Sequence, residues 1–463
     1  MENKNNKDRT ISEFFDTDYK DFSQYVAENR ALPGIDGFKT GARKIMHAAF
    51  KGSLKDGAQK KIPNLAGDTM NLSLYAHGDA SLNSTCITLS QEHKFNLNPL
   101  YIDSQNGSLR DSSTASPRYL YVKLSKYASL WKTDIELTEQ IFDEGQLIEP
   151  KYYLPIIPMQ IINRQEGMSP GFRFSTMSYN PIDVIDACKL VLTSKKQKPL
   201  DDMVISPYIR GIKKKNWKFE DGSWVNYGEF LWDEKKKTIY VTDLPYDMEY
   251  AGFEKILEKL RENGDIRDWS DYSEDGNIDY RIDCKRGAWA ATLIGKTVNS
   301  KIVNNKIRTK LKLRKVLPDD CLWVLDENKK VRHFTHIKGL IEYFVNFRLT
   351  KYSDRKKRLV KILEERLKKN DELVKFIELV CKGKLKIRNR SKADIKTDMD
   401  SYKLPMELIG TPMSKVTIEE RDELLKQNES IRKELNYIKT TTETQMYIND
   451  LDSLRKELEK DFR

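Results

Sequence analysis

Apolar and polar residues change their spacing along the chain, and these changes divide it into four segments. Residues 1–24 are polar with little periodicity, which predicts a flexible arm. Residues 25–146 carry short helical patterns between glycine-containing turns, and residues 147–332 mix strand-like alternation with helical patterns. Residues 333–463 are dominated by helical spacing. The pattern therefore predicts a multidomain α+β protein with three folded regions after the arm.

The second segment opens with a helical pattern that combines apolar and basic positions. Lys39, Arg43 and His47 recur at intervals of four residues, whereas Ile45 and Ala49 fall on the other side. A helix with this pattern is expected to bury its apolar side and to expose the basic one. We therefore expect this helix to present positive charge on one face.

A second helix is predicted to follow, with Asp79 as its N-cap. Its buried stripe is expected to consist of Leu82, Cys86 and Leu89. A strand-like run occupies residues 119–123. Two helices joined by a glycine-containing turn and followed by a strand are typical of a winged-helix domain, a relative of the helix-turn-helix that places one helix in the DNA major groove.

The later segments contain longer elements. Residues 238–242 predict a strand and residues 250–263 a helix. Residues 337–381 lack proline and carry apolar residues at helical spacing, and after a polar break at 382–416 a further helix opens with a capping-box pattern at 417–420. Two long helices that run out and back, with a small tip between them, are expected here.

Composition narrows the class of protein. The 463 residues include 81 Lys and Arg against 70 Asp and Glu, a net charge of +11 that is compatible with a polyanionic partner. The five cysteines are scattered singly, without a zinc or disulfide pattern. No apolar run approaches the roughly 20 residues that span a bilayer, and no signal-peptide core is visible. These features predict a cytoplasmic protein, in the host cytoplasm if the source is viral, that binds no membrane.

One set of motifs points to a specific chemistry. Residues 115–121 (ASPRYLY) place Arg118 directly before Tyr119, so a phosphate-binding guanidinium lies beside a nucleophilic oxygen. The surrounding motifs are RALPGIDGFK at 30–39, YAHGD at 75–79, SQNGS at 104–108, EPKYYLPIIPM at 149–159 and EGMSPG at 166–171. In this order and at these spacings, the set resembles the breakage-reunion region of type IIA DNA topoisomerases. The residues of these motifs are most similar to those of the eukaryotic and T-even-phage branch.

The resemblance implies a domain plan and an activity. Residues 25–146 would form the winged-helix breakage-reunion domain, residues 147–332 the α+β tower domain, and residues 333–463 a long antiparallel coiled coil with a small helical exit-gate tip. The implied reaction is transient cleavage of both DNA strands through 5′-phosphotyrosyl links, passage of a second duplex, and religation.

The resemblance also implies roles for individual residues. Tyr119 would be the nucleophile, Arg118 would hold the attacked phosphate, and His77 would contact the scissile phosphate region or help the proton leave. DNA-binding roles fall to Arg30, Lys39, Arg43, Met168 and Lys213. Of these, Met168 would be an apolar wedge between base pairs unless it is a core methionine, and Lys213 belongs to a basic cluster that either follows the bent DNA or is a solvated turn.

Other family motifs are not found in this sequence. There is no Glu-Gly-Asp-Ser-Ala-like segment, no Asp-x-Asp-x-Asp run and no glycine-rich ATP-binding motif, so no metal ligand is assigned. The expectation is that Mg²⁺ and ATP are bound by a partner subunit that carries a Toprim and an ATPase domain, and that the chain forms a homodimer on double-stranded DNA. The alternatives are a non-catalytic, DNA-binding coiled-coil protein of the chromosome-architecture type and, less well matched, a tyrosine recombinase.

Overall fold

The computed structural model describes residues 10–233, 235–274, 276–284, 300–317, 321–387 and 390–462. The chain divides into two compact units, one made of Met1–Val345 with Ser453–Arg463 and the other of Asn346–Asp452. Both helices and antiparallel sheets are present, so the predicted α+β class is confirmed. Among the described residues, no helix is both long enough and apolar enough to cross a membrane.

Helical turns begin earlier in the first unit than the sequence pattern indicates. They are α1 (Ile11–Phe14), η1 (Phe15–Tyr19), α2 (Lys20–Val26) and η2 (Ala27–Ala31). Thr10 caps α1 in a capping box with Glu13, which satisfies backbone N–H groups that a helix start leaves open. The expected flexible arm is therefore helical from Ile11 onward, whereas residues 1–9 lie outside the described part of the chain.

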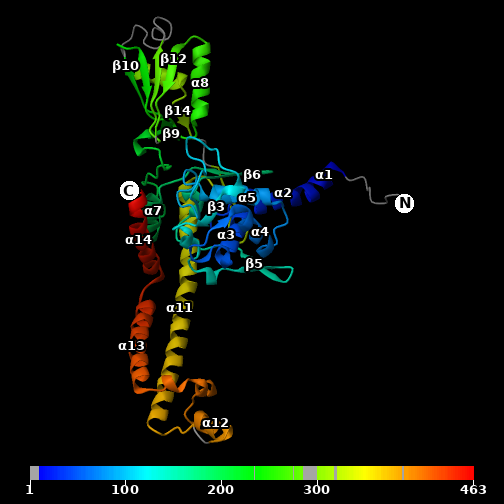
Figure 1. Cartoon of the computed structure of the whole chain (residues 1–463), viewed down its shortest axis with the longest axis vertical. Coiled ribbons are helices and arrows are strands. Elements are labelled where there is room, and N and C mark those ends of the chain that lie inside the picture. The colour runs from blue at the N-terminus through cyan, green and yellow to red at the C-terminus, as the bar shows by residue number, and fades with distance from the viewer. Residues whose placement is uncertain are drawn as a thin grey trace, which may run out of the picture. The chain divides into compact units, whose positions relative to one another are not determined.

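Three helices and a small sheet follow. They are α3 (Thr40–Ala48), α4 (Ile62–Leu72) and α5 (Asp79–Ser90), beside the antiparallel strands β1 (Lys60–Lys61), β2 (Leu100–Ile102) and β3 (Tyr121–Leu124) in the order β1-β3-β2 (Figure 1). The predicted stripe of α5 is confirmed, because Leu82, Cys86 and Leu89 are all buried. The N-cap of α5 is Gly78, and Asp79 is the first helical residue.

The expected basic face of α3 is wrong. Arg43 and His47 are buried together with Ile45 and Met46, so the helix buries most of its circumference. A buried arginine is tolerated only with a partner, and Asp36 supplies it from the preceding loop.

Two further strand pairs flank this region. Strands β6 (Gln165–Ser169) and β7 (Phe172–Thr176) form a hairpin in a sheet of order β16-β15-β7-β6, completed by β15 (Cys321–Leu325) and β16 (Val331–Phe334). Strands β4 (Gln140–Asp143) and β5 (Gln146–Pro150) pair separately, and the helices nearby in sequence are α6 (Met159–Ile162) and α7 (Pro181–Thr193).

The remaining part of the first unit contains two antiparallel sheets. The order β10-β11-β13-β12 combines Phe230–Asp233, Thr238–Val241, Tyr280–Cys284 and Ile266–Asp271, and α8 (Tyr250–Glu262) packs against it (Figure 1). The order β14-β9-β8 combines Arg314–Val316, Ser223–Tyr227 and Trp217–Glu220, and α10 is Ser300–Lys310. The predicted strand near 238–242 and helix near 250–263 are thus confirmed as β11 and α8.

Helices make up the second unit, and two of them, α11 (Ile337–Cys381) and α14 (Glu443–Phe462), extend beyond its bounds at Asn346 and Asp452. The 45-residue helix α11 has the predicted bounds, and α13 (Ile418–Thr440) returns with Thr417 as its N-cap. Leu363 of α11 packs against Ile431 and Ile438 of α13, and this contact holds the two helices together. The polar break contains α12 (Lys392–Ser401), whose Met399 packs in a core with Phe376 of α11 and Leu424 of α13, and α14 follows α13. The short turns elsewhere are η3 (Ala49–Ser53), η4 (Lys55–Gly57), η5 (Pro117–Tyr119), η6 (Ala128–Trp131), η7 (Ile135–Leu137), η8 (Lys214–Asn216), η9 (Met406–Gly410) and η10 (Met413–Lys415).

Candidate functional site

Arg118 and Tyr119 lie on the exposed turn η5, immediately before β3. Pro117 opens the turn, and the backbone N–H of Tyr119 donates to the carbonyl of Ser116 at 2.9 Å. The ring of Tyr119 is 67% exposed, and the guanidinium carbon of Arg118 lies 5.2 Å from its centroid. A nucleophile and a phosphate-binding cation are therefore presented together to solvent.

The expected strand over 119–123 begins later than predicted, at Tyr121. Because Tyr119 lies on a turn before the strand, the alternation of side chains along β3 does not fix its direction relative to Tyr121. Both rings are exposed, Tyr121 to 50%. Lys61 lies 5.8 Å from the Tyr121 ring centroid, so this second tyrosine has a cation of its own.

The loop that leads to η5 is tied down by buried polar contacts. The side chain of Gln91, at the end of α5, donates to the carbonyl of Asn106 at 2.9 Å. Arg110 is 7% exposed and donates to Asp243 at 3.1 Å and to the carbonyl of Leu244 at 2.6 Å. The same guanidinium also donates to the carbonyls of Pro245 and Met248. Sequence analysis missed Arg110, because its partners lie more than 130 positions away and most are carbonyls.

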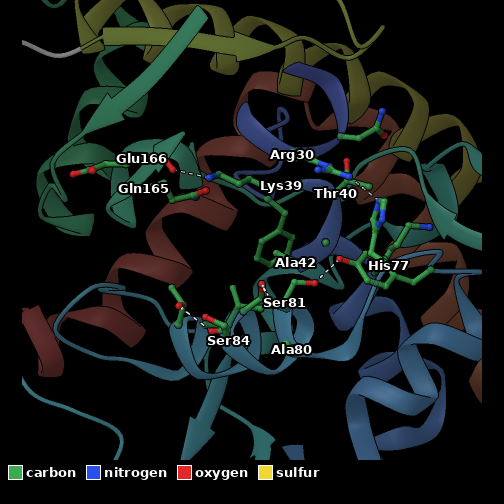
Figure 2. Close-up of a pocket in the computed structure, with 18 of the residues that line it drawn as sticks. Arg30, Lys39, Thr40, Ala42, His77, Ala80, Ser81, Ser84, Gln165 and Glu166 are labelled. Carbon is green, nitrogen blue, oxygen red and sulfur yellow. Dashed lines mark hydrogen bonds between the residues drawn. The ribbon is translucent and has the colours of Figure 1, made fainter. Parts of the chain in front are cut away.

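A cavity of about 1120 Å³ opens between α3, α5 and the β6 strand (Figure 2). Its lining includes Arg30, Lys39 and His77, three of the predicted site residues. Arg118 and Tyr119 do not line it. The structure thus brings together basic residues of two separate motifs, 30–39 and 75–79, but holds the Arg-Tyr pair at a different place on the chain surface.

His77 and Arg30 are in direct contact. The Nη2 atom of Arg30 lies 3.3 Å from Nε2 of His77, and the hydroxyl of Tyr25 lies 3.0 Å from the same nitrogen. Because a guanidinium can only donate, Nε2 of His77 accepts in the contact with Arg30. All three side chains are exposed, so the pair is open to a ligand in the cavity.

Lys39 is held at the edge of the same cavity. Its Nζ donates to the carbonyl of Glu166 at 2.6 Å, which joins the residue before α3 to strand β6 (Figure 2). Burial lowers the pKa of Lys39, and the nearby Glu166 carboxylate opposes that shift. This ammonium group is therefore already engaged with the protein backbone.

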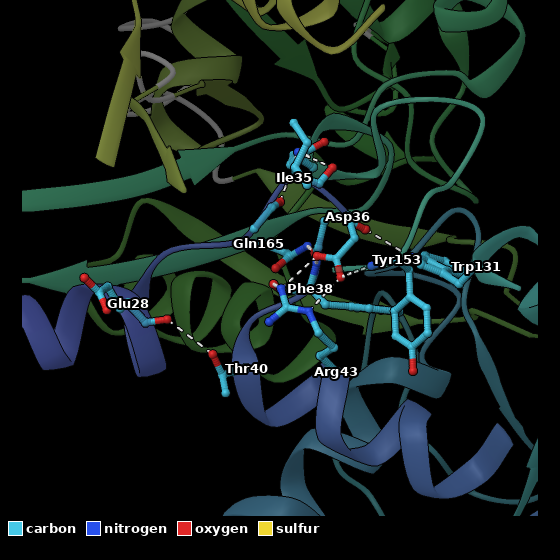
Figure 3. Close-up of polar contacts among 12 residues, drawn as sticks. Glu28, Ile35, Asp36, Phe38, Thr40, Arg43, Trp131, Tyr153 and Gln165 are labelled. Carbon is cyan, nitrogen blue, oxygen red and sulfur yellow. Dashed lines mark hydrogen bonds and ion pairs between the residues drawn. The ribbon is translucent and has the colours of Figure 1, made fainter. Parts of the chain in front are cut away.

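Arg43, in contrast, does not face the cavity or the solvent. Its Nε donates to Asp36 at 2.7 Å and its Nη2 to the second oxygen at 2.9 Å (Figure 3). Asp36 is fully buried and Arg43 only 6% exposed. Burial lowers the pKa of Arg43, but the Asp36 carboxylate, with smaller contributions from Glu149 and Tyr153, brings it above its ordinary value. The prediction that Arg43 binds the DNA backbone conflicts with this burial.

The remaining two predicted residues lie on separate strands and turns. Met168 is 77% exposed on β6 and pairs across the hairpin with Arg173, so it is not a core methionine. Lys213 precedes η8 and donates to Glu229 at 2.8 Å, and this hydrogen bond raises its pKa. Lys215 pairs with the same carboxylate, which neutralises part of the predicted basic cluster.

The residues that the structure describes offer no cluster of metal ligands. Within residues 10–462, apart from the gaps named above, His, Cys, Asp and Glu side chains form no group of three that could hold a metal ion.

Comparison with known proteins identifies the family. A family model that describes the type-A subunits of DNA gyrase and topoisomerase IV matches residues 30–453. The mitochondrial DNA topoisomerase 2 of Dictyostelium discoideum is 27% identical over 98% of this chain and 36% of its own length, and DNA topoisomerase 2 of Arabidopsis thaliana is 27% identical over 97% and 33%. The chain spans about a third of the length of these relatives.

A solved structure shares the fold. The DNA-binding, cleavage and re-ligation domain of Plasmodium falciparum topoisomerase II superposes with a TM-score of 0.80 at 22% identity, and the match covers 97% of this chain and 65% of that chain. The family model, which spans most of the sequence, confirms the family expected from the motifs. The chain belongs to the family of type-A subunits of DNA gyrase and topoisomerase IV, and it corresponds to the DNA breakage-reunion region of type IIA topoisomerases.

Proposed function

We propose that this chain cleaves and rejoins double-stranded DNA, with Tyr119 as the nucleophile and Arg118 as the residue that holds the attacked phosphate. The observation that carries the proposal is the exposed Arg118–Tyr119 pair, with the guanidinium 5.2 Å from the ring centroid. A guanidinium keeps its charge and offers forked donors to phosphate oxygens. Such a group stabilises the negative charge that builds on the phosphate during attack.

The reaction is a transesterification whose atoms and charges balance. The Tyr119 oxygen forms a bond to phosphorus while the bond from phosphorus to the deoxyribose 3′-oxygen breaks, and the tyrosine proton ends on the leaving 3′-hydroxyl. For each phosphodiester bond that is broken in the DNA, one phosphodiester bond forms between the 5′-phosphate and the tyrosine. The reverse attack by the 3′-hydroxyl therefore rejoins the strand. Positioning and electrostatics carry most of such a transfer.

The cavity lined by Arg30, Lys39 and His77 supports a path for the DNA backbone. Arg30 and His77 are exposed and within 3.3 Å of one another, which makes them suitable for one phosphate. His77 would contact the scissile region or accept a proton through its ring. The exposed Met168 would enter the duplex between base pairs and bend it. Lys213, which forms an ion pair with Glu229, would contact only the outer arms of the bent DNA.

The assembly with other chains is part of the proposal. Two copies of the chain would act on opposite strands, and a second kind of subunit would supply the Toprim and ATPase parts. Type IIA topoisomerases use Mg²⁺ and ATP, and we assign the binding of both to that partner. In this plan residues 25–146 are the winged-helix domain, 147–332 the tower and 333–463 the coiled coil with its exit gate, as in the medium subunit of the T-even bacteriophage enzyme.

The test is a cleavage assay with and without the partner. Full-length chain is mixed with supercoiled DNA, Mg²⁺ and a Toprim-bearing partner, and the reaction is stopped with denaturant. Linear DNA bound to protein is expected when both proteins are present and not with Tyr119→Phe, while ATP is needed only for strand passage. DNA binding without any cleavage in the complete mixture would instead support the architectural coiled-coil protein.

A further inference from the structure

The hairpin of β6 and β7, which carries Met168, rests on the segment that carries Arg30. Strand β6 packs against η2, the turn that includes Arg30. Gly167, next to Met168, has no side chain because there is no room for one: a Cβ atom would lie 1.9 Å from the carbonyl oxygen of Ala31. The strand backbone therefore touches the backbone of the 30–39 segment directly.

Two side-chain hydrogen bonds also hold the same hairpin. The Nζ of Lys39 donates to the carbonyl of Glu166, and the side-chain amide of Gln165 donates to the carbonyl of Gly37 (Figure 2, Figure 3). Gly37 in turn has a φ of +79° and packs against Met159, so its carbonyl is fixed in place. Lys39, Gln165 and Gly167 form what we call the hairpin clamp.

The clamp links two functional features through a short stretch of chain. At one end of the 30–39 segment, Arg30 contacts His77 in the cavity. At the other end, Lys39 holds the carbonyl two residues before Met168. The strand that carries Met168 is thus in direct backbone contact with Ala31, the residue next to Arg30.

We propose that Lys39 is a positioning residue, which fixes the Met168 hairpin and thereby couples the bending of DNA to the placement of Arg30 and His77 at the cleaved strand. The inference rests on the proposed function, since it assumes that Met168 enters the duplex. It replaces the expected role of Lys39 as a phosphate contact. A lysine that contacts phosphate acts through released counterions, whereas the ammonium of Lys39 acts through a protein carbonyl.

The two roles differ in their dependence on salt. Loss of one phosphate contact should reduce the slope of log affinity against log salt by about 0.9. Lys39→Met is expected to leave this slope unchanged. It should reduce the DNA bend angle and lower the yield of cleaved DNA about tenfold or more, because a misplacement of about 1 Å at the reacting groups can cost about 100-fold in rate. Lys39→Arg keeps a hydrogen-bond donor and should therefore retain part of the DNA bend angle and part of the cleavage yield.

The decisive experiment is a double-mutant cycle in the full chain with its Toprim-bearing partner and Mg²⁺. If Lys39 acts through the hairpin, the variant Lys39→Met/Met168→Ala should bend and cleave DNA no less than Met168→Ala alone. Lys94 also lines the cavity. Lys94→Met removes one charge from it and serves as the control, because its effect should add to that of Met168→Ala. Gly167→Ala moves the strand without changing any charge and should reproduce the Lys39→Met result.

A reduced salt slope together with additive effects in the cycle would overturn the inference and make Lys39 a phosphate contact. Normal bending by a folded Gly167→Ala protein would also overturn it. Failure of the proposed function looks different, because the unsubstituted chain would then give no cleaved DNA at all. Thermal midpoints of each variant, measured without DNA, separate misfolding from loss of positioning.

Discussion

Replacing Arg43 by alanine should lower the stability of the protein rather than its affinity for DNA. The substitution leaves Asp36, which is fully buried, without its charged partner. The carboxylate would keep hydrogen bonds from the backbone N–H groups of Phe38 and Tyr153, at 3.0 and 3.1 Å, but would lose two from the guanidinium. Removing one partner of a buried ion pair destabilises a protein by about 3–5 kcal/mol.

The structure also indicates how far the damage should spread. The carbonyl of Asp36 accepts a hydrogen bond from the indole of Trp131, which stacks on Phe38 at 4.8 Å (Figure 3). A shift of Asp36 therefore reaches the aromatic core beside α3. In chemical denaturation, Arg43→Ala should unfold at a lower denaturant concentration than the unsubstituted protein. The midpoint of Arg43→Lys should lie between the two, because lysine keeps the positive charge but lacks the two parallel N–H donors of the guanidinium.

Lys51→Ala provides the matched control, since Lys51 is an exposed cation just after α3 and its removal should change the free energy of unfolding by no more than about 0.5 kcal/mol. The DNA affinity of Arg43→Ala, measured where the protein is still folded, should keep its salt dependence. An unchanged denaturation midpoint, together with a shallower slope of log DNA affinity against log salt, would refute the reasoning. Arg43 would then be a residue that contacts DNA.

Two further changes test other parts of the structure. The pKa of His47 is lowered to about 4 by burial and by Lys51 and Lys44, whereas an unfolded histidine binds its proton near pH 6.5. Burial likewise lowers the pKa of His93 to about 4. The fall in unfolding free energy between about pH 6.5 and about pH 4 should therefore be smaller by up to roughly 3 kcal/mol in His47→Gln than in the unsubstituted protein, and equal falls in the two proteins would contradict this cause. Arg110→Met should speed hydrogen exchange in residues 104–117 and reduce cleavage, because that loop loses its buried anchor on residues 243–248. Exchange rates equal to those of the unsubstituted chain would show that Arg110 does not hold the loop.

Periodicity predicted the long elements well. Helix α11 has the expected bounds, and α8 and β11 lie where the patterns put them, because each buries an apolar side whose spacing is visible in the sequence. The N-terminal helices were missed, although Ile11, Phe14, Phe15, Tyr19 and Phe22 also recur at helical spacing. Their side chains are exposed, and the polar residues between them obscured the pattern.

The motifs predicted candidate residues for the site, but not the groups that these residues contact. The motifs pointed to Arg30, Lys39 and His77, and these three residues line one cavity. The error at Arg43 arose because spacing reports residue type and not the partner, here a carboxylate seven positions earlier. Likewise, the contact of Lys39 with the Glu166 carbonyl joins residues 127 positions apart, and no local pattern encodes a backbone acceptor at that separation.

The most direct test of the central claim is to identify the atom that carries the DNA. Cleavage reactions that contain the chain, a Toprim-bearing partner, Mg²⁺ and DNA labelled at either end are stopped with denaturant and digested with nuclease and protease. Mass spectrometry of the peptide over residues 115–125 should find a nucleotide on Tyr119, attached through the 5′ end of the cut strand. Tyr121→Phe should give the same adduct, and Tyr119→Phe none. A nucleotide on Tyr121 or on another residue, attachment through the 3′ end, or an adduct that survives in Tyr119→Phe would contradict the assignment.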